Sequence, residues 1–154
     1  MPIPIWQRLL GLLVYVLPWS DAIPIGQHLF IQFPVLQWPT LPAMPLFILE
    51  SGIPLNLGNL LVFFVLFLAV VRNPNVPYFI RFNTLQALLV DIIVVIISYA
   101  FAILPIGGGL MMRTLSSTVV VGVLAVVIFA LIECSRGREP DLPGLSQAVR
   151  MQLY

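Results

Sequence analysis

The sequence predicts an all-α integral membrane protein with four transmembrane helices and an interfacial, proline-rich segment between the first and second. Hydrophobic residues make up 60% of the 154 residues and charged residues only 8%, whereas an ordinary soluble domain has about 25% charged residues. A soluble fold of this size could not cover its surface with so few charges. Long uncharged runs, separated by proline, glycine and arginine, supply the four expected crossings.

Composition also argues against several function classes. The formal net charge is +1 and all seven basic residues are arginine, so electrostatics provides no argument for binding nucleic acid. Cys134 is the single cysteine and His28 the single histidine, which leaves neither a disulfide nor a metal-binding set to propose. No pair of carboxylates has a spacing that suggests acid–base chemistry. We therefore expect no enzyme, no metal and no cofactor.

The first helix is expected at about residues 5–20. The apolar run at residues 5–17 would span only about 20 Å at 1.5 Å per residue, which is short of a hydrocarbon core of about 30 Å. Either the helix continues past Pro18 with a kink, or the bilayer is thin at this point.

Residues 21–56 cannot contain a helix of spanning length, because prolines interrupt them throughout: Pro24, Pro34, Pro39, Pro42, Pro45 and Pro54. Backbone without internal hydrogen bonds is excluded from lipid, so we expect this segment in the interface or covered by helices. Trp19 and Trp38 suit headgroup depth. Asp21 and Glu50 are expected at the water boundary on one side of the membrane.

The second and third helices are expected at about residues 56–71 and 78–104. Arg72, Asn73, Pro74 and Pro77 lie between them, and each proline lacks an amide donor and disfavours helical backbone in the residue before it. This segment therefore predicts a tight turn between two antiparallel helices. The third helix is closed by Pro105 and the glycines at 107–109.

The fourth helix is expected at about residues 114–132, which are uncharged and long enough to cross. Residues 1–135 would then form one four-helix transmembrane domain, and residues 136–154 a polar, mobile C-terminal tail. With both termini on the cytoplasmic side or its equivalent, one side carries six arginines and the other only Arg113. This distribution obeys the positive-inside bias.

Asp91 is the most informative single residue, because it lies about ten to twelve residues inside the third helix, near the expected midplane. A carboxylate there costs several kcal/mol unless it is paired, solvated or protonated. Asn83 and Ser98 are expected on a similar face, directed into the bundle or a wet cavity. Asp91 is then either a structural clasp to a neighbouring helix or part of the lining of a conduit.

Arg81, Asn83 and Gln86 occupy the first turns of the same helix and, with Asp91, form a candidate functional polar cluster. They could bind an acidic partner or line an entrance. Alternatively, the arginine reaches lipid phosphates and the two amides link helices.

The residues from Arg72 to Asp91 resemble a family pattern. Arg72, Asn73 and Pro77, followed by the run Tyr78-Phe-Ile-Arg-Phe-Asn83 and then by Gln86, Ala87 and Asp91, are similar to the twenty-kilodalton Tic component of the chloroplast inner-envelope translocon and its cyanobacterial relatives. The resemblance is specific over this stretch only. It implies a first helix that crosses the membrane and a subunit of a protein-translocating assembly.

The resemblance also implies a cyanobacterial plasma or thylakoid membrane, or a plastid inner envelope, as the location. The expected partners are the bilayer, other membrane subunits and a preprotein, with channel formation only as an oligomer or with partners. Two alternatives remain open: a structural, accessory or assembly subunit of a photosynthetic or other complex, and a small ion-coupled transporter using Asp91.

Overall fold

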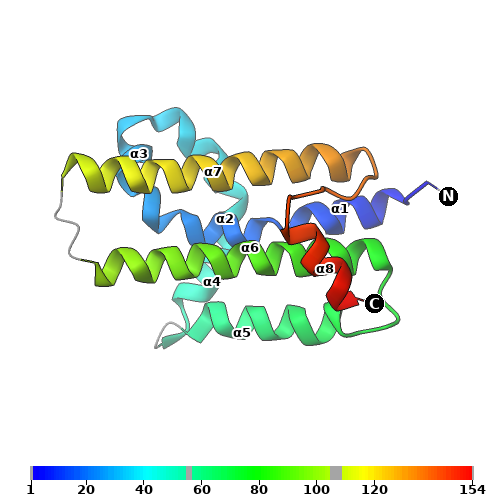
Figure 1. Cartoon of the computed structure of the whole chain (residues 1–154). Helices are drawn as coiled ribbons and strands as arrows, with labels where there is room; N and C mark the ends of the chain where they lie inside the picture. The colour runs from blue at the N-terminus through cyan, green and yellow to red at the C-terminus, as the bar shows by residue number, and fades with distance from the viewer. Residues whose placement is uncertain (1, 55–56, 105–108, 154) are drawn as a thin grey trace.

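In a computed structural model, which describes residues 2–54, 57–104 and 109–153, every regular element is a helix. The longest are α6 (Tyr78–Ile103) and α7 (Leu110–Ser135), each of 26 residues and apolar enough to cross a membrane. Figure 1 shows them running antiparallel, and the N-terminal helices of the chain contact both of them. The prediction of an all-helical membrane protein is therefore confirmed, whereas the number of four crossings and the interfacial position of the proline-rich segment remain predictions.

The N-terminal segment is bent. Helix α1 (Ile5–Leu13) is followed by α2 (Val16–Ala22), which contains Pro18, so the chain continues past this proline as a helix. The next helices, η1 (Pro24–Gly26) and α3 (Gln27–Gln32), continue at an angle of 46° to them, and the bent pair together could form a third span.

The proline-rich segment forms short helices: α3, η2 (Pro34–Ala43) and α4 (Met44–Ser51). Trp19, which was expected at headgroup depth, is only 4% exposed and so is covered by the protein itself. Its indole N–H donates to the carbonyl oxygen of Pro39 at 2.9 Å, and its ring packs edge-on against Phe30. Trp38, by contrast, is 73% exposed. Trp19 therefore anchors the proline-rich segment to α2.

The hairpin before α6 begins with α5 (Leu57–Leu66) and the π-helical turn η4 (Phe67–Val71). These fifteen residues form an apolar helix shorter than the two long spans. The predicted start at Asn56 and the predicted turn at Pro105 and residues 107–108 lie outside the described residues.

Helix α6 occupies the centre of the fold, in contact with α1, α2, η4 and α8 (Leu145–Leu153). Its first half is buried almost all round, whereas its second half is largely exposed. Helix α7 buries one seam at intervals of three and four residues, as expected for a helix that packs on one face: Ser116, Val120, Val123, Val127, Ala130 and Cys134.

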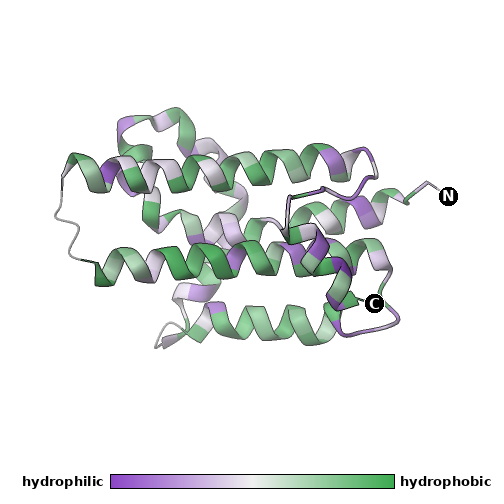
Figure 2. Cartoon of the chain, in the orientation of Figure 1, coloured by the Kyte–Doolittle hydropathy of each residue, from purple (hydrophilic) through white to green (hydrophobic). Residues whose placement is uncertain are grey.

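The sequence did not predict the C-terminal helix α8. It packs across α6 and buries Ser146 and Val149. The start of α1, helix α8 and the turn before α6 lie at the same end of the molecule, and the end of α6 and the start of α7 lie at the other end (Figure 1). Figure 2 shows hydrophobic residues along α5, α6 and α7, with hydrophilic ones concentrated around the C-terminal segment.

Candidate functional site

Gln86 links three parts of the chain inside the bundle. Its side chain is fully buried. The amide Nε2 donates to the carbonyl oxygen of Pro140 at 2.8 Å and to the hydroxyl of Tyr15 at 3.1 Å. Its Oε1 accepts a hydrogen bond of 2.6 Å from the hydroxyl of Ser146. This side chain therefore ties α6 to the N-terminal helices and to the tail at once.

Asn83 extends the same network by one turn. Its Oδ1 accepts from the Tyr15 hydroxyl at 3.0 Å and from the Cys134 thiol at 3.2 Å. Its Nδ2 donates to the carbonyl oxygen of Phe79 at 2.8 Å. Buried polar atoms must find partners, because an unpaired one costs free energy comparable to a lost hydrogen bond. The buried amides of Asn83 and Gln86 are both paired within the chain.

Asp91 lies further along α6 than Gln86, and a different set of side chains surrounds it. It is 1% exposed, and its carboxyl group is hydrogen-bonded to that of Asp21 in α2 and lies within electrostatic range of Glu50 in α4. Asn59 of α5 donates its amide to Asp21. A hydrogen bond between two carboxyl groups requires a proton on one of them. These four residues form what we call the acidic cluster.

The acidic cluster corrects one expectation. Asp21 and Glu50 were expected at the water boundary, but Glu50 is buried and both lie beside Asp91. One oxygen each of Asp91 and Glu50 is buried without a hydrogen-bond partner. Among the described residues, no group of three or more His, Cys, Asp or Glu is placed to hold a metal ion.

Ser98 does not join the candidate site. It was expected on the same inward face as Asp91, yet it is exposed, since the second half of α6 extends beyond the helices that cover the first half. The inward polar face thus ends near Asp91.

The turn before α6 has the conformation its sequence predicts. The Asn73 side chain accepts the N–H of Asn75 at 3.0 Å and so closes a local turn around Pro74. The carbonyl oxygen of Pro77 accepts the N–H of Arg81 at 3.1 Å, which begins α6 at Tyr78. Proline suits this position, because the first turn of a helix needs no amide donor.

Arg81 is held at the same turn. Its Nε donates to the carbonyl oxygen of Val71 at 2.9 Å, across the hairpin, and its side chain is partly exposed. Arg72 follows η4 directly and is exposed. The candidate cluster therefore divides into three places: Arg81 at the partly exposed turn, the two amides in a paired network, and Asp91 in the acidic cluster.

Comparison with known proteins covers nearly the whole chain. The family model described as "Chloroplast import apparatus Tic20-like" matches residues 3–149. The chain belongs to the Tic20-like family. The resemblance noted in the residues from Arg72 to Asp91 is thereby confirmed and extended to the regions on either side.

Relatives in the Tic20-like family come from cyanobacteria and plastids. A Tic20 family protein of Synechocystis is 39% identical over 150 residues, which cover 96% of this chain and 92% of the relative. Protein TIC 20-v, chloroplastic, of Arabidopsis thaliana is 30% identical over 153 residues, covering 96% and 71%. The Tic20 family protein Ycf60 of Gracilaria tenuistipitata is 34% identical over 163 residues, covering 98% and 77%. The chain is thus a membrane protein of an import-related family. The description of that family names an import apparatus and no catalysed reaction.

Sequence reasoning missed several residues of the site. Tyr15, Ser146 and Asp21 belong to segments that are far from α6 in the chain, and no local pattern marks them as its partners. Ser146 follows Gly144, whose φ of 79° favours glycine, and the pair Pro143-Gly144 was a signal for a turn before a helix.

Proposed function

We propose that this chain is a membrane subunit of a protein-translocating assembly of the Tic type. The observation that carries the proposal is the family match across residues 3–149. Three polar residues of the family pattern, Asn83, Gln86 and Asp91, are buried inside the bundle, which supports a fixed arrangement of α6 in such a subunit. The membrane is a cyanobacterial plasma or thylakoid membrane, or a plastid inner envelope.

Translocation by this chain requires an oligomer or partner subunits. Asn83 and Gln86 are fully buried and paired with groups of the same chain, so the first half of α6 offers no open polar path. The lipid-facing surface is apolar along α5 and α7 and along the second half of α6. Such faces can pack against other membrane subunits, and a polypeptide path would form between chains.

We further propose four crossings with both termini on the cytoplasmic or stromal side. The bent N-terminal helices and α5–η4 would supply the crossings beyond α6 and α7. The distribution of arginine supports this orientation, because one end of the bundle carries all but one of them. At that end lie Arg8, Arg72, Arg81, Arg136, Arg138 and Arg150, and Arg113 lies near the other.

Labelling of single cysteines with a membrane-impermeant thiol reagent tests this topology. In a Cys134→Ala background, Asn75→Cys and Gly109→Cys place one thiol at each end of α6 and α7. Both positions are exposed, and a side chain at Gly109 meets no atom within 4 Å. We expect labelling from opposite sides of sealed vesicles. Labelling of both from one side would contradict the topology.

Affinity purification in mild detergent, with mass spectrometry of the co-purifying proteins, tests the assembly. Translocon or secretion proteins are the expected partners. Recovery of photosystem subunits instead would favour the accessory function. Reconstitution in liposomes tests the need for partners, because a monomer that conducts a peptide unaided would contradict it.

An accessory or assembly subunit is the second candidate function. The observation that favours it is the internal pairing of Gln86, since a purely structural subunit needs no polar group directed to a substrate. The acidic cluster favours the third candidate, a small ion-coupled transporter, because a proton shared by Asp21 and Asp91 could be exchanged.

Asp91→Asn separates the last two candidates. The amide can donate to Asp21 and keep the structural contact, so an accessory or translocon subunit should keep its assembly unchanged. An ion-coupled transporter should lose its proton-linked flux in liposomes while remaining folded.

A further inference from the structure

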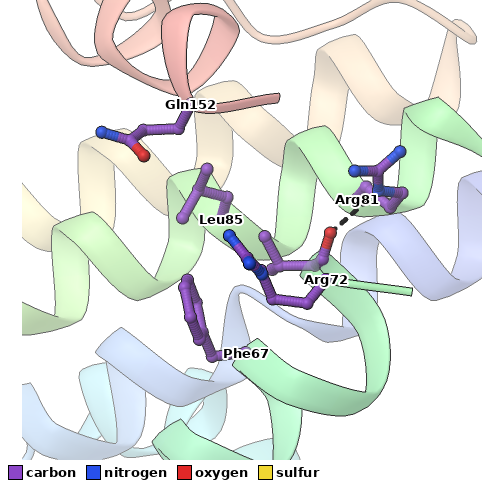
Figure 3. A pocket seen from close by; sticks show the side chains of 6 residues that line it. Phe67, Arg72, Arg81, Leu85 and Gln152 are labelled. Atoms are coloured by element: carbon purple, nitrogen blue, oxygen red, sulfur yellow. Dashed lines mark hydrogen bonds between the residues drawn. The ribbon is translucent and has the colours of Figure 1, made fainter. Parts of the chain in front are cut away.

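A small pocket lies where the hairpin before α6 meets the C-terminal helix. It has a volume of about 180 Å³ and lies between η4, the first turns of α6, and α8 (Figure 3). Its apolar lining residues are Phe67, Val71 and Leu85, and its polar ones are Arg72, Arg81 and Gln152. In Figure 3 the Arg72 side chain reaches toward Leu85, with Gln152 beyond, and a dashed line marks the hydrogen bond that Arg81 donates.

The two arginines of the pocket carry uncompensated charge. Arg81 uses its Nε to hold the Val71 carbonyl oxygen, which fixes the side chain and leaves the terminal nitrogens of its guanidinium available. Neither Arg72 nor Arg81 forms an ion pair with any residue in the described part of the chain, whereas Arg136 and Arg150 each have acidic partners. Both arginines line the pocket, and a guanidinium group provides the planar, multiple donors that bind phosphate well.

The position of the pocket indicates a lipid as the source of the anion. The pocket lies at the end of α5–η4, where an apolar helix gives way to the arginine-bearing turn, which is the depth of phosphate groups in a bilayer. Its floor is apolar, and along α5 and η4 exposed apolar side chains recur at three- and four-residue intervals: Leu57, Leu60, Leu61, Phe64, Val65 and Leu68. Acyl chains can pack against such an apolar surface, whereas a free phosphate has no apolar part that would contact it.

The lining also favours an anionic headgroup. None of the described lining residues is a carboxylate that could receive the ammonium group of a zwitterionic lipid. Gln152 contributes an amide to the rim, so the lipid would contact both the hairpin and α8.

We propose that Arg72 and Arg81 bind the phosphate of an anionic phospholipid, with its acyl chains along α5 and with Gln152 completing the headgroup site. The bound lipid joins the hairpin to the C-terminal helix. This binding site is independent of the proposed translocation function, because it requires only the bilayer as a partner.

The test is native mass spectrometry of the purified full-length chain, titrated with dioleoyl phosphatidylglycerol or dioleoyl phosphatidylcholine in mild detergent. We expect tighter binding of phosphatidylglycerol, and about tenfold weaker binding of it in Arg72→Gln and in Arg81→Gln. Arg72→Gln is the cleaner variant, because the Arg72 side chain makes no hydrogen bond among the described residues. Arg113→Gln, at the opposite end of the bundle, is the matched control and should bind like the wild type.

Three results would overturn the proposal. The first is equal binding of the two lipids by the wild-type chain. The second is a loss of phosphatidylglycerol in Arg113→Gln as large as in Arg72→Gln. The third is thermal stabilisation by inorganic phosphate alone that equals stabilisation by phosphatidylglycerol, since this would make free phosphate and not a lipid the ligand.

Discussion

Replacing Gln86 by leucine tests whether the buried amide network holds the fold together. Leucine has a similar volume and suits a helix inside a membrane protein, so the change removes polar atoms without leaving a large cavity. It deletes three hydrogen bonds, to Tyr15, Pro140 and Ser146. The substitution therefore isolates the contribution of the polar contacts.

The structure allows the magnitude of this loss to be worked out. Interhelical hydrogen bonds in membrane proteins average about 0.6 kcal/mol, and those in soluble proteins about 1 kcal/mol, so three bonds amount to about 2–3 kcal/mol by these averages. The partners are not stranded, because the Tyr15 hydroxyl still donates to Asn83 and the Ser146 hydroxyl still reaches the Pro140 carbonyl oxygen at 3.2 Å. We therefore expect about 2 kcal/mol of destabilisation, at the lower end of that range.

Thermal unfolding in mild detergent measures the effect. Gln32→Leu is the matched control, since Gln32 is exposed and the same chemical change there removes no hydrogen bond among the described residues. Because Gln86 holds the tail, limited proteolysis should also cleave the segment before α8 faster in Gln86→Leu. A variant as stable as the wild type, with an unchanged cleavage rate, would refute the reasoning.

Three further predictions concern packing. Gly58→Ala should destabilise the chain by about 1–3 kcal/mol, which is typical of overpacking, because the added Cβ would lie 2.4 Å from the backbone oxygen of Glu50. Gly122→Ala is the control, since a Cβ at Gly122 meets no atom within 4 Å. Melting curves compare the two variants. Cys134 is buried and should react with a maleimide only after unfolding, as a time course of labelling would show. Arg150→Gln should lower stability by about 1 kcal/mol, because it removes a cation–π contact, in which Arg150 Cζ lies 5.3 Å from the centre of the Phe82 ring, and ion pairs with Glu139 and Asp141. Salt should screen part of this effect, which melting at two salt concentrations checks.

The sequence predicted those features of the fold that depend on neighbouring residues in the chain, such as the start of α6. The start of α6 follows from Pro77, which ends the turn and accepts the first helical hydrogen bonds. The burial of Asp91 follows from the cost of exposing a carboxylate to lipid. The fourth predicted helix was too short, since α7 begins at Leu110 and includes Arg113, a charge that its position near the helix end allows.

Long-range partnerships could not be predicted in this way. Glu50 follows an apolar run and looked like a boundary residue, because nothing in its own sequence indicates that α4 returns to the centre of the bundle. Only the fold brings it to Asp91. The tail was missed for a related reason: α8 is too polar on average to be read as a packed helix, and its burial depends on the few side chains, Ser146 and Val149, that meet α6.

Helix α6 thus contains two different solutions to the problem of polar side chains in an apolar protein. Around Gln86 the amides are fully paired, so this part of the helix is fixed in one arrangement, and its disruption affects stability first. Around Asp91 an oxygen stays unpaired, and the carboxyl group lies beside that of Asp21. A change in the assembly or in the local solvent can alter that second contact without breaking the first. The acidic cluster is therefore the place where we expect contacts to change most readily while the amide network around Gln86 stays intact.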